Sequence, residues 1–185
     1  MDEYLEELID CIKKAKITSK KGDESIQAIV DGFTNVKQRN GKVFFIGNGG
    51  SAAIAMHMTA DFMKNGGIRT CSLYDSSVVT CLSNDHGYEE VFSRQLEFLA
   101  TKEDLLVAIS SSGKSQNIIN AIESARKNQA KVYTLTGFKE DNPVREMGDI
   151  NIYVPIEKYG IVESVHNLIL QEVVDVIMER DGARL

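Results

Sequence analysis

Residues 41–53 read Gly41-Lys42-Val43-Phe44-Phe45-Ile46-Gly47-Asn48-Gly49-Gly50-Ser51-Ala52-Ala53. The apolar run from Val43 to Ile46 does not alternate with polar residues, which is typical of a parallel strand covered on both faces. The glycines predict a turn free of Cβ crowding, and Ser51 stands where a helix N-cap is preferred. Because a helix start offers unpaired N–H groups and a partial positive charge, this segment predicts an anion site, most simply for phosphate.

The alternation of strand and helix continues along the chain. We expect further strands over 69–74, 104–109, 131–136 and 151–154, and helices over 51–64, 88–100, 116–128 and from 160 onward. A short helical segment follows Asp75, and Ser83 to Gly87 break it. Two amphipathic helices, over 1–14 and 23–37, precede the first strand. Strands that alternate with helices form βαβ units. The predicted fold is therefore α/β: a three-layer αβα sandwich with a mainly parallel sheet.

The length and composition are those of one globular domain, which we expect to span residues 1–185, with a helical pair over 1–40 and an α/β core over 41–185. The chain has 185 residues, 43% hydrophobic and 26% charged. A net charge of -6 argues against broad affinity for nucleic acid. No apolar run approaches the roughly 20 residues that span a bilayer. With an acidic amino terminus that lacks a hydrophobic signal core, these features predict a cytoplasmic protein without membrane partners.

Cysteine usage points to neither disulfides nor a structural zinc site. The three cysteines are odd in number and lack CxxC spacing. We expect them to be buried or semi-buried thiols.

A second loop, rich in serine, follows another predicted strand as Ser110-Ser111-Ser112-Gly113-Lys114-Ser115. Ligands of open α/β sheets bind beyond the carboxyl ends of the strands, where both loops stand. Hydroxyl and N–H groups there can surround a phosphate without a cation; the candidates are Ser51, Ser110, Ser111, Ser112 and Ser115. The first loop also fits a looser dinucleotide-binding pattern, with Gly47, Gly49, Ala52 and Asp75 as its residues. A dinucleotide site, however, would not require the serine-rich loop.

Four motifs in this order closely resemble the sugar isomerase (SIS) domain: Gly47-Asn48-Gly49-Gly50-Ser51, Asn84-Asp85-His86-Gly87, Ser110 to Ser115, and Leu135-Thr136-Gly137. The nearest branch is the phosphoheptose isomerases, which interconvert sedoheptulose 7-phosphate and glycero-manno-heptose 7-phosphate. The resemblance covers nearly the whole chain and implies phosphate contacts from the five serines and substrate contacts from Asn48, Gly49 and Asp85. Members of this branch are usually homotetramers, and in several of them the active sites lie between subunits and hold zinc.

The predicted reaction needs proton carriers, because aldose–ketose isomerisation removes a proton beside a carbonyl and passes through an ene-diol. His57 and Asp61 are four residues apart and share one helix face, which suits an acid/base pair or joint metal coordination. In the similar enzymes the position of Asp61 is normally Glu, proposed as a catalytic acid/base and metal ligand. Asp61 is therefore a candidate catalytic residue with a shorter reach.

The carboxyl-terminal helix departs from the family pattern. The resemblance puts Glu163 where Gln is usual, and Gln171 where the second catalytic and zinc-binding His is usual. Gln exchanges no protons near neutral pH and is a poor zinc ligand. We therefore expect Glu163 to act as the substitute acid/base, with Gln171 as a substrate contact in the same cleft, since roughly 80° separates them around the helix. His166 lies roughly 140° from Gln171 and is predicted to be a core or interface residue.

Two questions stay open at this point. One expectation is a zinc ion held by His57, Asp61 and Glu163; the alternative is no metal, because the ligands are altered. The predicted function is a phosphosugar isomerase that forms a homo-oligomer. The alternative, which the missing histidine favours, is a non-catalytic phosphosugar-binding or regulatory SIS protein, such as the relative that associates with the replication initiator DnaA.

Overall fold

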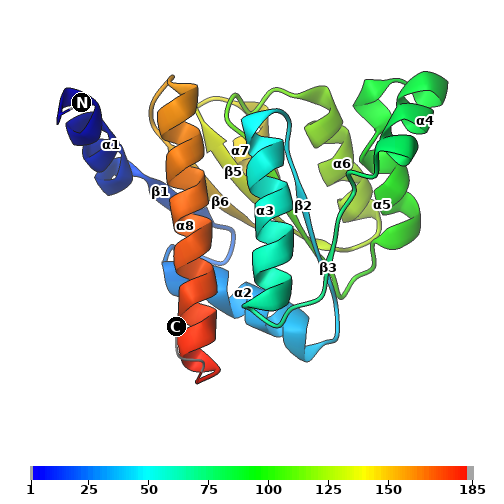
Figure 1. The fold of residues 1–185 in the computed structure, drawn as a ribbon, viewed down its shortest axis with the longest axis horizontal. Helices are drawn as coiled ribbons and strands as arrows, with labels where there is room; N and C mark the ends of the chain where they lie inside the picture. The colour runs from blue at the N-terminus through cyan, green and yellow to red at the C-terminus, as the bar shows by residue number, and fades with distance from the viewer. Residues whose placement is uncertain (1, 183–185) are drawn as a thin grey trace.

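A computed structural model describes residues 2–182 of the chain (Figure 1). The helices are α1 (Asp2–Lys14), α2 (Ile26–Gln38), α3 (Gly50–Lys64), α4 (Ser76–His86), α5 (Ser93–Leu99), α6 (Gln116–Lys127), α7 (Pro143–Met147) and α8 (Tyr159–Arg180), with a 3-10 turn η1 (Tyr88–Glu90). The strands are β1 (Lys16–Ser19), β2 (Val43–Ile46), β3 (Thr70–Cys71), β4 (Leu105–Ser110), β5 (Lys131–Gly137) and β6 (Ile150–Val154). Within residues 2–182, none of the helices is both long enough and apolar enough to cross a membrane.

The strands form one sheet in the order β1-β6-β5-β4-β2-β3. From β6 to β3 every neighbouring pair is parallel, and β1 is antiparallel to β6. The predicted α/β fold with a mainly parallel sheet is therefore confirmed. All residues of β2 and β4 are buried, as the uninterrupted apolar runs predicted.

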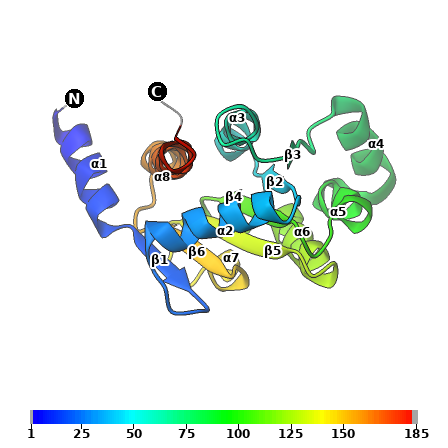
Figure 2. The ribbon, with the colours of Figure 1, turned by 90° about the horizontal axis from the view of Figure 1, so that it is seen from below.

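Two separate apolar cores cover the two faces of the sheet. Successive side chains of a strand point to opposite faces, so Phe45 packs in one core with α2, α3 and α8, while Phe44 packs in the other with α5 and α6. Figure 2 shows α3 and α8 on one side of the sheet and α6 and α7 on the other. These are the three layers of the expected sandwich.

The amino-terminal segment differs from the prediction. The expected pair of helices is present, but β1 lies between them and joins the sheet edge through pairs such as Ile17 with Ile152. Residues 1–40 are therefore not a purely helical pair that precedes the first strand. A four-residue edge strand gives little periodicity, and its pairing partner, β6, lies far along the chain.

Three further boundaries also differ. The strand expected over 69–74 is only Thr70–Cys71. Helix α4 continues to His86 and ends at Gly87, whose φ of 93° stops it. The single helix expected over 88–100 is instead the turn η1 followed by α5.

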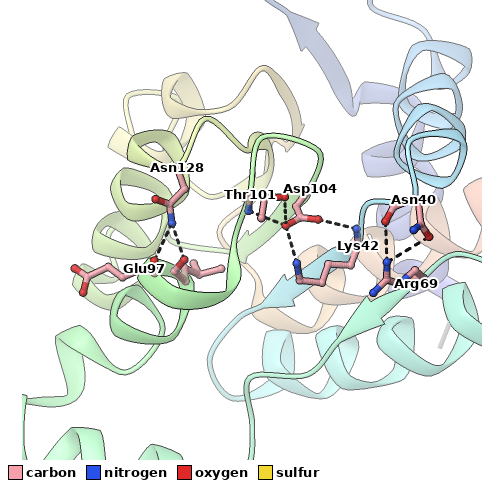
Figure 3. Close-up of polar contacts among 8 residues, drawn as sticks. Asn40, Lys42, Arg69, Glu97, Thr101, Asp104 and Asn128 are labelled. Atoms are coloured by element: carbon pink, nitrogen blue, oxygen red, sulfur yellow. Dashed lines mark hydrogen bonds and ion pairs between the residues drawn. The ribbon is translucent and has the colours of Figure 1, made fainter.

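At the amino ends of β2 and β4 a buried carboxylate joins the two strands (Figure 3). Asp104 is 2% exposed and accepts hydrogen bonds from the backbone N–H of Lys42 at 2.8 Å and of Thr101 at 2.7 Å. The Lys42 ammonium and the Thr101 hydroxyl donate to it as well, at 2.8 and 2.9 Å. Four donors compensate for the burial of this charge, so the cluster fixes the edge of the sheet opposite the predicted phosphate site.

Helices α3 and α8 lie side by side and run parallel (Figures 1 and 2). Each follows a strand of the parallel part of the sheet, so both begin at its carboxyl edge. Glu163 near the start of α8 lies against Gly50 at the start of α3, and Gln171 further along contacts Asp61. The helix pair therefore carries two separate groups of polar side chains, one with Glu163 at its start and one with Gln171 and Asp61 further along.

Candidate functional site

The glycine loop after β2 brings the start of α3 to the carboxyl edge of the sheet. Gly49 is the N-cap residue, and its φ of 55° lies in the left-handed region that favours glycine. The sequence suggested Ser51 as the N-cap, but Ser51 instead belongs to the first turn of α3. It is 4% exposed and lines the pocket described below.

A carboxyl group lies directly against this helix start. A Cβ at Gly50 would overlap the carboxyl group of Glu163, so glycine is required for that approach. Burial raises the pKa of Glu163 above its ordinary value. The structure thus places a carboxyl group that holds its proton to higher pH than usual beside the predicted phosphate loop.

Tyr74 holds the base of the same loop. Its hydroxyl donates to the carbonyl of Gly47 at 2.8 Å and accepts from the N–H of Gly47 at 2.7 Å. Burial raises the pKa of this phenol, which stays protonated. Sequence reasoning missed Tyr74, because no motif links it to a glycine 27 residues earlier.

The serine loop lies between β4 and α6. Ser110 and Ser111 are 5% and 4% exposed. Within residues 2–182, the buried hydroxyl oxygen of Ser111 has no hydrogen-bond partner. Ser115 is the N-cap of α6, yet its side chain makes no capping bond. A buried hydroxyl without a partner is costly, and a bound phosphate oxygen would supply one.

The two loops enclose a cavity of about 330 Å³. The residues that line it are Asn48, Gly49, Gly50, Ser51, Ile109, Ser110, Ser111, Ser112, Ser115, Tyr159 and Glu163. Three helices, α3, α6 and α8, begin here, and helix N-termini stabilise an anion. No lysine or arginine is among the described residues that line the cavity. The structure therefore brings the five predicted serines together in one pocket, whose N–H and hydroxyl groups are the donors that an anion needs.

A side-chain network fixes Asn48 in this pocket. Its amide nitrogen donates to Asn117 at 2.9 Å, and its amide oxygen accepts from Asn117 and from the hydroxyl of Tyr88, both at 2.9 Å. Its amide oxygen thus has two partners, and one N–H remains for a ligand oxygen. Asn117 and Tyr88 are further residues that sequence reasoning did not identify.

Asp85 is not brought to the pocket. It lies near the end of α4, is exposed, and accepts a hydrogen bond from Asn84 at 2.8 Å. It is not among the residues that line the cavity. The sugar contact expected from Asp85 is therefore absent from the pocket of its own chain. Asp75, the acid of the loose dinucleotide pattern, caps α4 by accepting from the N–H groups of Ser77 and Val78.

His57, Asp61 and Gln171 form a separate cluster between α3 and α8, which we call the Gln171 cluster. The amide nitrogen of Gln171 lies 2.9 Å from Asp61 Oδ2 and 2.9 Å from His57 Nε2, and these two atoms are 3.1 Å apart. Because a carboxylate only accepts hydrogen bonds, the Gln171 amide must present its nitrogen here. Gln171 is therefore not part of the cavity, where a substrate contact had been expected.

This cluster does not fit the expected zinc site. Among residues 2–182, no three His, Cys, Asp or Glu side chains are placed to hold a metal. Glu163, the third expected ligand, precedes Gln171 by eight residues, which is roughly 12 Å along the helix. The donor of Gln171 occupies the space between His57 and Asp61, and an N–H group cannot coordinate a cation. The set of His57, Asp61 and Glu163 is thus not assembled within the chain.

His166 is a core residue, in agreement with the prediction. It is 0% exposed, and its Nε2 donates to the carbonyl of Thr136 at 3.1 Å. Burial lowers its pKa to about 4, so the ring is neutral near pH 7. It anchors α8 to the strand that lies beside the serine loop.

Comparisons with known proteins agree with this fold and pocket. A profile of the SIS domain matches residues 3–137. The chain is 34% identical over 168 residues to the phosphoheptose isomerase of Helicobacter pylori strain P12, covering 85% of this chain and 87% of that protein. It is 39% identical over 146 residues to the phosphoheptose isomerase of Aliarcobacter butzleri, covering 75% and 77%.

A solved structure of a phosphoheptose isomerase also has a similar fold. The phosphoheptose isomerase GmhA of Neisseria gonorrhoeae superposes with a TM-score of 0.84 at 29% identity, covering 95% of this chain and 96% of that one. These relatives are enzymes by name, and they do not favour the alternative of a non-catalytic, DnaA-associating protein. The chain belongs to the SIS domain family, in its phosphoheptose isomerase branch.

Proposed function

We propose that this isomerase interconverts sedoheptulose 7-phosphate and glycero-manno-heptose 7-phosphate, or a closely related pair of sugar phosphates. One observation carries the proposal: a pocket formed by two serine loops and three helix starts, with a carboxyl group inside it. The name shared by its relatives supports the heptose version. A cytoplasmic location belongs to the proposal, because the substrate is a charged sugar phosphate.

The phosphate would bind among Ser51, Ser110, Ser111, Ser112 and Ser115. Their hydroxyls, with the N–H groups at the start of α3, donate to its oxygens. Asn48 would donate its remaining N–H to an oxygen of the sugar. These contacts fix one end of the substrate and direct its carbon chain along the pocket.

Glu163 would carry a proton in the reaction. It is the one carboxyl group among the described residues that line the pocket. Burial raises the pKa of this carboxyl above its ordinary value, in the direction that suits a general acid/base. It would move a proton between the carbon beside the carbonyl and the substrate oxygens as the ene-diol forms and collapses.

Asp61 would act on a substrate held by a second copy of the chain. It follows Gly50 by eleven residues, roughly 16 Å along α3, which is farther than an extended seven-carbon sugar phosphate reaches. The helices that carry the Gln171 cluster expose Met56 by 48%, Met63 by 57% and Leu168 by 47%. Contact with a second copy would remove these apolar side chains from water. We therefore propose a homotetramer in which the Gln171 cluster of one copy faces the pocket of another.

The proposed chemistry uses no metal, because within one chain the amide nitrogen of Gln171 occupies the space between His57 and Asp61. Asp61 carries the second acid/base role, and Gln171 holds it in place. His57 accepts from Gln171 and completes the support.

The test is turnover of sedoheptulose 7-phosphate by the purified protein, followed by NMR. We expect the aldose product without added zinc, and a loss of at least about 100-fold in kcat for Asp61→Asn, which cannot exchange the proton. Asp141→Asn, an exposed position outside both sites, is the matched control. No turnover with or without zinc would contradict the heptose assignment, and full activity of Asp61→Asn would remove Asp61 from the mechanism.

A further inference from the structure

An aromatic side chain stands at the rim of the phosphate pocket. Tyr159 is the first residue of α8 and the one aromatic residue among the described residues that line the cavity. It is 60% exposed, although a ring of this size is favoured out of water. The other lining residues offer the pocket hydroxyls, amides, a carboxyl group and the single aliphatic side chain of Ile109.

A second aromatic ring fixes the position of Tyr159. Phe138 packs against it edge to face, with ring centroids 4.7 Å apart and planes at 67°. This geometry is a favoured one for aromatic pairs. The contact with Phe138 therefore supports the ring of Tyr159 beside the pocket.

Phe138 itself holds an unusual backbone conformation. Its φ of 59° lies in the left-handed region, which bulky residues rarely adopt. Two bonds hold it there: its N–H donates to the carbonyl of Ile156 at 3.1 Å, and its carbonyl accepts from the hydroxyl of Tyr153 at 2.7 Å. Backbone strain that the surroundings enforce in this way is concentrated at functional sites.

The strained residue is also connected directly to the phosphate loop. Gly137, which precedes Phe138, donates its N–H to the carbonyl of Ser111 at 2.9 Å. The pair of Phe138 and Tyr159 is thus built onto the same framework as the serines. Its position relative to a bound phosphate is fixed by backbone bonds.

We propose that Tyr159, supported by Phe138, determines specificity by packing its ring against the carbon chain of a phosphorylated sugar. Carbon-bound hydrogens of a sugar carry a small positive charge, and the face of an aromatic ring is negative. The serines would recognise the phosphate alone, whereas Tyr159 would distinguish a sugar phosphate from inorganic phosphate. The proposal rests on the proposed function only in taking the ligand to be a sugar phosphate.

Calorimetric titration of the full chain with two probes tests this proposal. Sorbitol 6-phosphate has the carbon chain and the phosphate but no carbonyl to isomerise, and inorganic phosphate has no carbon chain. We expect Tyr159→Ala to weaken the binding of sorbitol 6-phosphate by roughly 3- to 10-fold and to leave the affinity for inorganic phosphate unchanged. Tyr159→Phe keeps the ring and should bind both probes like the wild type.

Phe138→Gly provides an independent variant. It removes the supporting ring and relieves the positive φ, so the fold should be retained. We expect the same selective loss for sorbitol 6-phosphate, with some loss of thermal stability, because the Phe138 ring also packs against the core. The proposal would be overturned if the variants bound both probes equally more weakly, or if Tyr159→Ala and Phe138→Gly both left the two affinities unchanged.

The outcomes also separate this proposal from the assignment of the reaction. Neither probe is converted, so the affinities can be read even if sedoheptulose 7-phosphate proves not to be a substrate. Turnover of the sugar with no selective effect of Tyr159→Ala would overturn the role of Tyr159 and leave the isomerase intact.

Discussion

At the scale of single residues, Glu163 has two opposing effects in the pocket. In the proposed mechanism its carboxyl group exchanges a proton with the substrate, but once ionised it would also repel a phosphate bound by the serines. The raised pKa of Glu163 limits this repulsion, since the group stays protonated to higher pH than an exposed glutamate. Replacing it by the neutral Gln should therefore separate binding from catalysis.

Glu163→Gln should bind sorbitol 6-phosphate roughly tenfold more tightly than the wild type at about pH 8, where Glu163 is charged. Below the pKa of Glu163 the two proteins should bind alike, because both side chains are then neutral. Turnover of sedoheptulose 7-phosphate should be lost in the variant. Titration calorimetry at several pH values from about pH 8 downward checks the binding, as the ratio of the two affinities at each pH. Glu157→Gln, exposed just before α8, is the control, and an equal gain in that variant would contradict the prediction.

Gln171 is a second residue whose chemistry decides the properties of its site. Its amide nitrogen lies at 2.9 Å from both Asp61 and His57. The site therefore already has a donor at the position a cation would need. Gln171→His would replace that donor by a third ligand, because neutral imidazole binds zinc well.

We expect Gln171→His to bind zinc at least about tenfold more tightly than the wild type, measured by titration with zinc chloride and by elemental analysis of the purified proteins. Gln171→Asn keeps the amide and should not gain zinc. One tightly bound zinc per chain in the wild type would contradict our description of this cluster.

The meeting of the two loops in one pocket could largely be predicted from local sequence, because each loop follows its own strand and parallel strands end at one edge. The residues that hold the loops could not. Tyr74 and Asn117 reach Gly47 and Asn48 across 27 and 69 residues. The separation of Glu163 from His57 and Asp61 was also missed, because a helical wheel gives the angle between two residues and not the axial distance.

At the scale of the elements, the junction between α8 and β5 depends on a neutral histidine. The pKa of His166 is about 4 in the folded protein against 6.5 when exposed. Between these values the unfolded chain binds a proton that the folded chain does not. The contribution of His166 to the free energy of unfolding is therefore complete above pH 6.5. The free energy of unfolding falls as the pH drops, by roughly 3 kcal/mol once the pH reaches the pKa of His166 in the folded protein.

His166→Asn should remove this part of the pH dependence, since Asn can still donate to Thr136 but does not titrate. Urea unfolding at several values between about pH 7.5 and pH 4 measures it, as the difference between variant and wild type. His86→Asn changes an exposed histidine and should behave like the wild type. If His166→Asn showed the wild-type slope, His166 would not be the group responsible.

Most elements followed from apolar periodicity, and those that differed have physical causes. The strand β1 gains its stability from pairing with β6, more than 130 residues away in such pairs as Ile17 with Ile152. The turn η1 interrupts a pattern that reads as one helix, and it carries Tyr88 to Asn48. Tertiary contacts determine both β1 and η1, and the periodicity of apolar residues in the sequence carries no information about such contacts.

At the scale of the whole molecule, the parallel pair of α3 and α8 has the phosphate pocket at one end and the Gln171 cluster further along. One chain cannot apply Glu163 and Asp61 to the same substrate, given the roughly 16 Å along α3 that separates Asp61 from the helix start. The exposed apolar side chains of Met56 and Leu168 lie on the helices that carry the cluster. The complete active site is therefore expected between two copies.

Mixing two inactive variants tests this claim most directly. Glu163→Gln and Asp61→Asn are each expected to be inactive alone. If one copy supplies Glu163 and another supplies Asp61, subunits that are mixed and exchanged at random should recover roughly a quarter of the wild-type turnover of sedoheptulose 7-phosphate. If both residues act within one chain, every site of the mixture carries one defect. Turnover no higher than that of the separate variants, with subunit exchange verified, would contradict the shared site.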